Sequence, residues 1–237
     1  MRRITKTKLA NGIFLVRFAT QYELASTFLR FQEYFESSRF AGRIFTLEEF
    51  MDWYASKFHA FSYFEDWTGF NIPSTIFEPF VSGRFDPLLE KEKRLIKLFE
   101  GEREPFYIIG VSESSARDDL THEVAHALFF RDGAYKTAVL AALREYDTAR
   151  IERELHQLGY TKDVLKDEVH AYLISGDRSV KTLANRRLIP LRKRLQAIFR
   201  THSAPIIKKG SGIERKAMGR LPRHNGPRTR SVRKGAR

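Results

Sequence analysis

Residues 120–130 read LTHEVAHALFF and contain the pattern H-E-x-x-H, formed by His122, Glu123 and His126. Residues four apart in an α-helix lie on one face, so both imidazole rings can reach a single cation. Glu123 stands beside them and is the residue type that takes a proton from an activated water. The spacing therefore predicts a hydrolytic metal site, provided that this segment is a helix.

The residues around the two histidines predict a helix that is buried on all sides. At about 100° per residue, apolar or aromatic side chains share the histidine face and also cover the opposite face. These side chains are Leu120, Val124, Ala127, Leu128 and Phe129. Buried histidines need partners that offset their lost hydration. A metal ion is one such partner, and hydrogen bonds to backbone or to a carboxylate are the alternative.

Glu168 is the candidate for a third ligand. It lies near the middle of a broad apolar arc in the segment 161–173, whereas Asp167 and His170 are expected to face solvent. An acid at the centre of an apolar helical face is costly unless it is paired. The partner is either a metal held by His122 and His126 or a buried Arg or Lys.

Together these residues resemble the zincin metallopeptidases of the gluzincin type, in which a glutamate on a later helix completes the site. The resemblance covers about residues 105–175 and implies Zn²⁺ bound by His122, His126 and Glu168, with Glu123 as the general base. It also implies hydrolysis of a protein or peptide substrate, because zinc lowers the pKa of its bound water towards about 7 and polarises the carbonyl.

The sequence does not decide which neighbouring residues support the metal ligands or stabilise the oxyanion. Many gluzincins place an acid or a histidine four residues after the glutamate ligand, where this chain has Tyr172. The residues that can instead support a metal ligand are Asp163, Asp167 and Glu113. The candidates for stabilising the oxyanion are Tyr172, His170, Tyr160 and His156.

Sequence patterns before and after the motif predict the strand and helices that hold it in place. Residues 105–112 form a short, β-rich apolar run that predicts a strand, and the resemblance implies that such a strand can be the sheet edge that binds an extended substrate. Asp118 and Asp119 are typical of a helix start. Further helices are expected over residues 134–146, 149–158, 162–173 and 180–200.

The N-terminal part, residues 1–104, is rich in aromatic side chains. A strand is expected at 12–18 and a core helix at 22–37, because its apolar residues have helical spacing. Thr46 and Glu49 form a capping box that starts a helix reaching Phe58, and Asp86-Pro87 predicts the start of another that ends at Gly101. Between these two helices, residues 63–85 are expected to form a packed aromatic loop, with substrate contact as the alternative.

Charge is concentrated at the C-terminus. The formal net charge is +13, and residues 205–237 contain eleven Lys or Arg against Glu214 alone, which leaves +3 for residues 1–204. Rich in Gly, Pro and Arg, this segment is expected to be disordered. It can bind nucleic acid or another polyanion through counterion release, or serve as a solubilising tail.

These observations predict an α+β, mainly helical, zincin-like fold with a small sheet beside the H-E-x-x-H helix. Residues 1–104 and 105–204 are expected to pack as one body, followed by the disordered basic tail at 205–237. The apolar runs are too short for a membrane span or a secretory signal, and a cytoplasmic location is expected. The chain has no cysteine, so any metal must use His, Asp, Glu or water.

Two other classes of function remain beside the zinc metallopeptidase. One is a non-catalytic nucleic-acid-associated binding protein that uses the basic tail, with the motif either metal-free or structural. The other retains zinc but catalyses a different hydrolysis, or processes proteins on nucleic acid with the tail as a localising segment.

Overall fold

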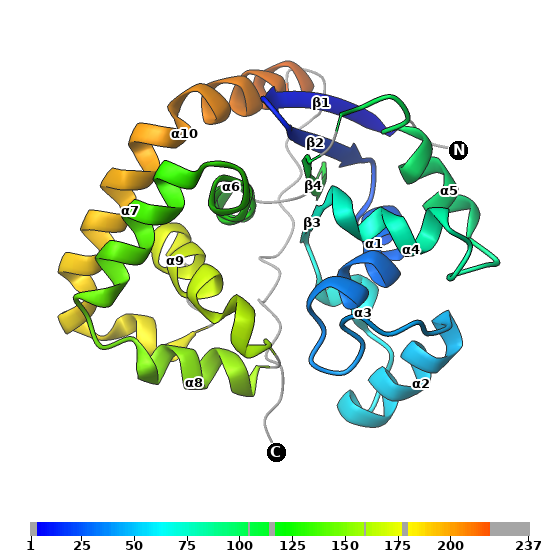
Figure 1. The fold of residues 1–237 in the computed structure, drawn as a ribbon, viewed down its shortest axis with the longest axis horizontal. Helices are drawn as coiled ribbons and strands as arrows, with labels where there is room; N and C mark the ends of the chain where they lie inside the picture. Colours follow the sequence, from blue (N-terminus) through cyan, green and yellow to red (C-terminus); the bar gives the residue numbers. More distant parts are fainter. Residues whose placement is uncertain (1–3, 104, 114–116, 159, 177–179, 219–237) are drawn as a thin grey trace.

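The computed structural model describes residues 4–103, 105–113, 117–158, 160–176 and 180–218 (Figure 1). The strands are β1 (Thr5–Ala10), β2 (Ile13–Phe18), β3 (Gly69–Pro73) and β4 (Tyr107–Ser112). The helices of the first half are α1 (Gln21–Glu36), α2 (Leu47–Phe58), α3 (Tyr63–Asp66), α4 (Glu78–Val81) and α5 (Glu90–Lys97). Those of the second half are α6 (Arg117–Arg131), α7 (Gly133–Arg144), α8 (Ala149–Gln157), α9 (Leu165–Ser175) and α10 (Ile189–Met218). Short 3₁₀ turns are η1 (Ser74–Phe77), η2 (Lys162–Val164), η3 (Lys181–Ala184) and η4 (Arg186–Leu188).

The four strands form one sheet in the order β1-β2-β4-β3. β1 pairs antiparallel with β2, β2 pairs parallel with β4, and β3 pairs antiparallel with β4. Three of these strands come from residues 1–104 and one from the second half, so the sheet joins both halves of the chain. The fold is therefore α+β and mostly helical, as the sequence predicts.

Alternating side chains of the sheet enter two separate cores. Ile13 and Leu15 of β2 pack with α6, α7, α9 and α10, whereas Phe14, Val16 and Phe18 pack on the aromatic face. Successive side chains of a strand point to opposite faces of the sheet, so consecutive apolar residues in β2 indicate that both faces are covered. Figure 1 shows the result, with α1 to α5 on one side of the sheet and α6 to α10 on the other.

The predicted start of α2 is confirmed. The Thr46 hydroxyl accepts a hydrogen bond from Glu49 N at 3.1 Å and caps α2. Thr20 caps α1 in the same way through Glu23 N. Both caps satisfy backbone donors that have no partner within the helix.

The expectation of a packed loop over residues 63–85 was wrong in part, because it contains the edge strand β3. Phe70 and Ile72 of β3 enter the aromatic core. The strand is five residues long and ends at Pro73, which is tolerated because β3 has a partner on one side only. Strand β1 was not predicted from the sequence.

The helix that was expected to begin at Asp86-Pro87 begins at Glu90 instead. Its start is fixed by Glu92, whose carboxylate accepts from Leu89 N at 2.9 Å. The same carboxylate pairs with Arg30 of α1, and both side chains are buried. A tertiary ion pair therefore decides where α5 begins.

The last helix differs from its predicted bounds at both ends. α10 begins at Ile189, after the turns η3 and η4, and continues to Met218. Helix α10 thus extends past residue 205, where the disordered basic tail was predicted to begin, and the remainder of that tail, 219–237, lies outside the described residues. Ile206 is buried in the core on this side of the sheet, so tertiary packing extends the helix beyond Pro205.

None of the helices in the described part of the chain combines the length and the apolar composition needed to cross a bilayer.

Candidate metal centre

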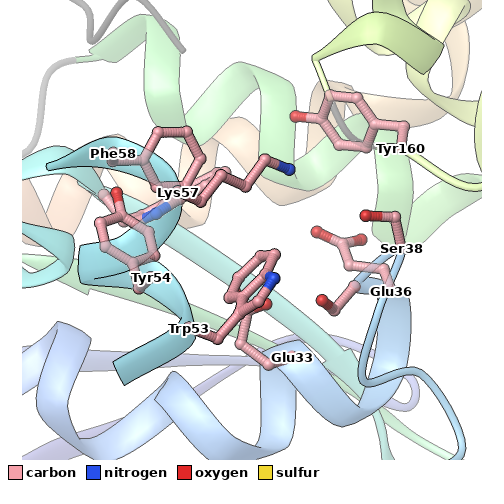
Figure 2. A pocket seen from close by; sticks show the side chains of 10 residues that line it. Glu33, Glu36, Ser38, Trp53, Tyr54, Lys57, Phe58 and Tyr160 are labelled. Carbon is pink, nitrogen blue, oxygen red and sulfur yellow. The ribbon is translucent and has the colours of Figure 1, made fainter. Parts of the chain in front are cut away.

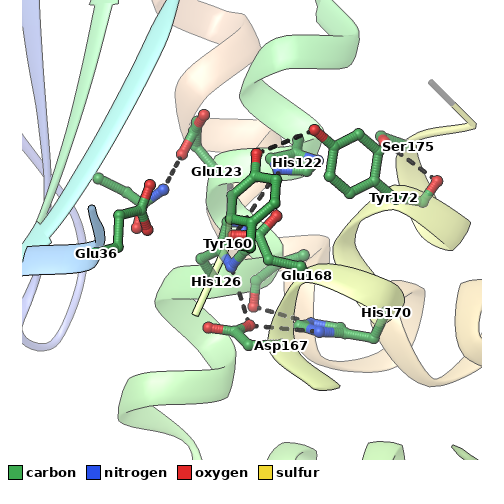
Figure 3. Close-up of polar contacts among 12 residues, drawn as sticks. Glu36, His122, Glu123, His126, Tyr160, Asp167, Glu168, His170, Tyr172 and Ser175 are labelled. Carbon is green, nitrogen blue, oxygen red and sulfur yellow. Dashed lines mark hydrogen bonds and ion pairs between the residues drawn. The ribbon is translucent and has the colours of Figure 1, made fainter. Parts of the chain in front are cut away.

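The H-E-x-x-H segment lies on α6, which packs against β3 and β4 on one side and against α9 on the other. Val124, Ala125, Ala127 and Leu128 are buried in the core shared by these elements. The helix is therefore buried on all sides, as its sequence predicts. Its two histidines project towards α9, which carries Glu168 (Figure 3).

His122, His126 and Glu168 lie close enough to hold one metal ion. Each offers a ligand atom, and these atoms all lie within 4.8 Å of one another. The two Nε2 atoms are 3.0 Å apart, and the carboxylate of Glu168 lies 3.8 Å from His122 Nε2 and 3.6 Å from His126 Nε2. The convergence that was predicted from the motif and the later helix is thus present.

Glu168 itself fits the role of a ligand better than that of a salt-bridge partner. Its side chain is only 4% exposed, and within the described residues its ion-pair partners are the two histidines rather than a Lys or Arg. Its Oε2 is buried and accepts no hydrogen bond from the described residues. A cation between the three side chains would provide the missing partner.

The electrostatics of the cluster also favour a cation. Burial and the neighbouring His126 lower the pKa of His122, so its ring is neutral and offers a lone pair. Burial lowers the pKa of His126, but the carboxylates of Asp167 and Glu168 more than offset this and raise it. Burial, together with nearby acids that include Glu36, raises the pKa of Glu168. A raised pKa favours the neutral acid form of Glu168, and a cation bound beside it would favour the carboxylate instead.

Asp167 and His170 were expected to face solvent, which was wrong for His170 and only partly right for Asp167, whose side chain is 24% exposed. His170 is fully buried, with its ring stacked on Phe129 at 4.9 Å between centroids. Asp167 places Oδ1 2.9 Å from His126 Nδ1 and 3.4 Å from His170 Nδ1. Helix α7 covers this face of α9 through Tyr135, and the helical wheel of α9 alone could not reveal that cover.

Of the three acids proposed to support a ligand, Asp167 is the one in contact with a histidine of the cluster. Asp163 and Glu113 are exposed. A carboxylate on Nδ1 fixes the tautomer of a histidine and leaves Nε2 for the metal. Asp167 therefore orients His126 towards Glu168.

Glu123 is buried beside the cluster and is held from the edge strand. Asn71 of β3 donates from Nδ2 to Glu123 Oε2 at 2.6 Å, and the Tyr107 hydroxyl donates to Asn71 Oδ1. The Tyr107 bond fixes which end of the Asn71 amide faces Glu123. A Cβ on Gly69 would lie 2.6 Å from Glu123 Oε1, so this carboxylate needs a glycine at that position.

The strand before the motif is not the sheet edge that the resemblance implied. β4 lies between β2 and β3, and β3 forms the edge on the side of Glu123. Asn71 N donates to Gln32 Oε1 at 3.2 Å, so this backbone group of the edge is used within the chain.

The four candidates for oxyanion support occupy different places. The Tyr160 and Tyr172 hydroxyls are 3.1 Å apart, and the Tyr172 ring lies edge-on to His122 at 4.8 Å between centroids. Burial raises the pKa of Tyr160 well above its usual range, so its hydroxyl stays protonated. His156 is exposed, and its Nδ1 lies 2.9 Å from the Tyr160 carbonyl oxygen. Burial lowers the pKa of His170 to about 4, so this ring is neutral behind His126.

The sequence reading missed Asn71 and Gly69 as residues of this site. Both belong to β3, and their position against Glu123 results from strand pairing between distant segments. The alternation of buried Phe70 and Ile72 was the one local signal that could have revealed the strand.

Comparisons of the chain with protein-family models, with curated proteins and with solved structures found no match.

Proposed function

We propose that the protein is a zinc-dependent metallopeptidase that hydrolyses peptide bonds. The observation that supports this most is the convergence of His122, His126 and Glu168 within 4.8 Å, with the carboxylate of Glu123 beside them. Two imidazole nitrogens and one carboxylate form a donor set typical of catalytic zinc, which keeps a position open for water or substrate.

A bound zinc ion would supply Lewis acidity, polarising the peptide carbonyl and lowering the pKa of water. Glu123 is the general base in this proposal, because its carboxylate lies beside the cluster, follows His122 directly in α6, and does not belong to the ligand set. It would accept a proton from the attacking water and pass it to the leaving amine. Asn71 orients the carboxylate for both transfers.

Tyr172 is the better placed candidate to stabilise the developing oxyanion. Its ring contacts His122, and its hydroxyl is bonded to that of Tyr160. A neutral hydroxyl donates a hydrogen bond to an oxyanion without adding charge. Tyr160 would hold this hydroxyl in place.

The test is the Glu123→Gln variant of the full-length protein. The amide retains the size of the carboxylate but cannot accept the proton, so cleavage of a mixed-sequence peptide library should fall by at least about a hundredfold. Metal content and the melting temperature should stay near the wild-type values, because Glu123 is not a ligand. Equal cleavage by wild type and variant would contradict the assigned role.

A further inference from the structure

A pocket lies between α1, α2 and the segment that leads into α9 (Figure 2). Its walls include two acids and several aromatic rings. Its acids are Glu33 and Glu36 of α1, and α2 contributes Trp53, Tyr54, Lys57 and Phe58. Trp67, Tyr160 and two serines after α1 also line it.

Two chains of contacts connect this pocket to the metal centre. On one side Tyr160 is bonded to Tyr172, whose ring contacts His122. An isolated β-bridge between Ser37 and Tyr160 joins the end of α1 to the segment before α9, so this connection is part of the fold.

The second connection runs through α1 and the edge strand. Gln32 donates to Glu36 Oε1 at 2.7 Å and accepts from Asn71 N, and Asn71 in turn holds Glu123. The pocket is therefore connected to the proposed general base through Gln32 and Asn71, and to His122 through Tyr172. A substrate whose scissile bond reaches Glu123 would place a neighbouring side chain here.

The chemistry of the lining favours a cationic side chain. The lining carries the carboxylates of Glu33 and Glu36 and the ammonium of Lys57. That ammonium lies 5.1 Å from the Trp53 ring centroid and 5.4 Å from that of Phe58. These are distances at which a cation is attracted to the face of an aromatic ring, so the rings already accept an ammonium group.

Lys57 does not block the pocket permanently. It lies in the last turn of α2, is exposed, and has a long flexible side chain. An incoming cation could therefore replace its ammonium over the rings while Lys57 turns to solvent. Tyr54 keeps its ring in place, because its hydroxyl donates to Asp66 Oδ2 at 2.6 Å.

We propose that this pocket receives the side chain of a lysine or arginine of the peptide substrate, next to the bond that is cut. This inference rests on the proposed peptidase activity and adds a substrate class to it. Glu33 and Glu36 supply the negative charge, and Trp53, Phe58 and Trp67 supply the aromatic surface that covers the aliphatic stem.

The pocket can be tested without catalysis, because Trp53 and Trp67 are the two tryptophans of the sequence and both line it. Nα-acetyl-lysine amide should change the tryptophan fluorescence of the full-length protein in a saturable way. Its affinity should exceed that of Nα-acetyl-norleucine amide by about tenfold or more, because the two ligands differ by the ammonium group. Equal affinities, or tighter binding of Nα-acetyl-glutamate amide, would overturn the proposal.

Substitutions of the lining residues test whether the lysine amide binds in this pocket. Glu33→Gln and Glu36→Gln should each reduce the preference for the lysine amide, whereas Glu48→Gln, on the exposed start of α2, should not. Lys57→Met removes the internal competitor at an exposed site and should raise affinity for the lysine amide. A Lys57→Met protein that binds it more weakly would contradict the exchange of cations.

The same experiment separates this proposal from the proposed function. A protein that selects the lysine amide but cleaves no peptide would contradict the peptidase assignment and support the pocket. An active peptidase that cuts next to lysine and norleucine with equal efficiency would overturn the pocket and retain the peptidase.

Discussion

Oδ1 of Asp167 lies 2.9 Å from Nδ1 of His126, while Nε2 of the same ring faces His122 and Glu168. Asp167 thus fixes the orientation of one proposed zinc ligand, and the next residue in the chain, Glu168, is a second proposed ligand. Consecutive residues of α9 can divide these roles because Glu168 lies deeper than Asp167 between α6 and α9.

This relationship predicts that Asp167→Ala weakens zinc binding without abolishing it. Loss of such a carboxylate partner typically lowers metal affinity by about 10- to 100-fold, because the histidine loses its fixed tautomer and some of its basicity. Competition with a chelator of known affinity measures the change. Asp163→Ala is the matched control, since Asp163 is exposed in the preceding turn. Equal zinc affinity in Asp167→Ala and wild type would contradict the role of Asp167.

Zinc binding should also strengthen as the pH rises. The folded-state pKa of His126 is raised, so its proton stabilises the metal-free fold below the unfolded value of about 6.5, and this contribution is lost as the pH rises through the folded pKa. Zinc must displace that proton. The increase in melting temperature on adding zinc should therefore be larger at a pH of about 8 than at about 6. An increase that is the same or larger at the lower pH would contradict this.

A third prediction concerns the space beside Glu123. In Gly69→Ala the new Cβ would lie 2.6 Å from Glu123 Oε1, the mobile end of a side chain, so the carboxylate should move while the fold persists. A displacement of about 1 Å can cost about a hundredfold in rate, and zinc content should not change. Gly133→Ala is the control, because its Cβ would meet no atom within 4 Å. Full activity in Gly69→Ala would show that the position of the Glu123 carboxylate does not require glycine at residue 69.

The basic tail can be tested separately from the metal centre. Residues 219–237 contain seven Lys or Arg and no Asp or Glu. If they bind a polyanion, their deletion should lower affinity for unrelated DNA and RNA, most clearly at low salt, because phosphate contacts release counterions. Zinc content should be unchanged, since the cluster lies on α6 and α9. Identical salt titrations of the full-length and truncated proteins would exclude the tail as the anchor.

The sequence predicted the convergence of His122, His126 and Glu168 because local periodicity determines most of it. His122 and His126 share a helical face by their spacing, and Glu168 is an acid that lies in an apolar arc. Their ligand atoms converge because α6 and α9 pack together. The same periodicity gave the wrong environment for His170, because burial on that face depends on Tyr135 of a different helix.

The support around Glu123 could not be predicted in the same way. Asn71 reaches Glu123 because β3 pairs with β4, and the register of strands so distant in sequence has no local signal. The start of α5 likewise depends on the ion pair between Arg30 and Glu92. Tertiary contacts of this kind override local start signals such as Asp86-Pro87.

Binding of one zinc ion by His122, His126 and Glu168 can be tested by measuring the zinc content per chain. The purified wild-type protein should contain about one zinc per chain, and His122→Ala, His126→Ala and Glu168→Ala should each lose it while folded by circular dichroism. His156→Ala, an exposed histidine outside the ligand set, should retain the metal. Wild-type protein that binds no zinc, or a Glu168→Ala protein with undiminished zinc content and affinity, would contradict the proposed centre.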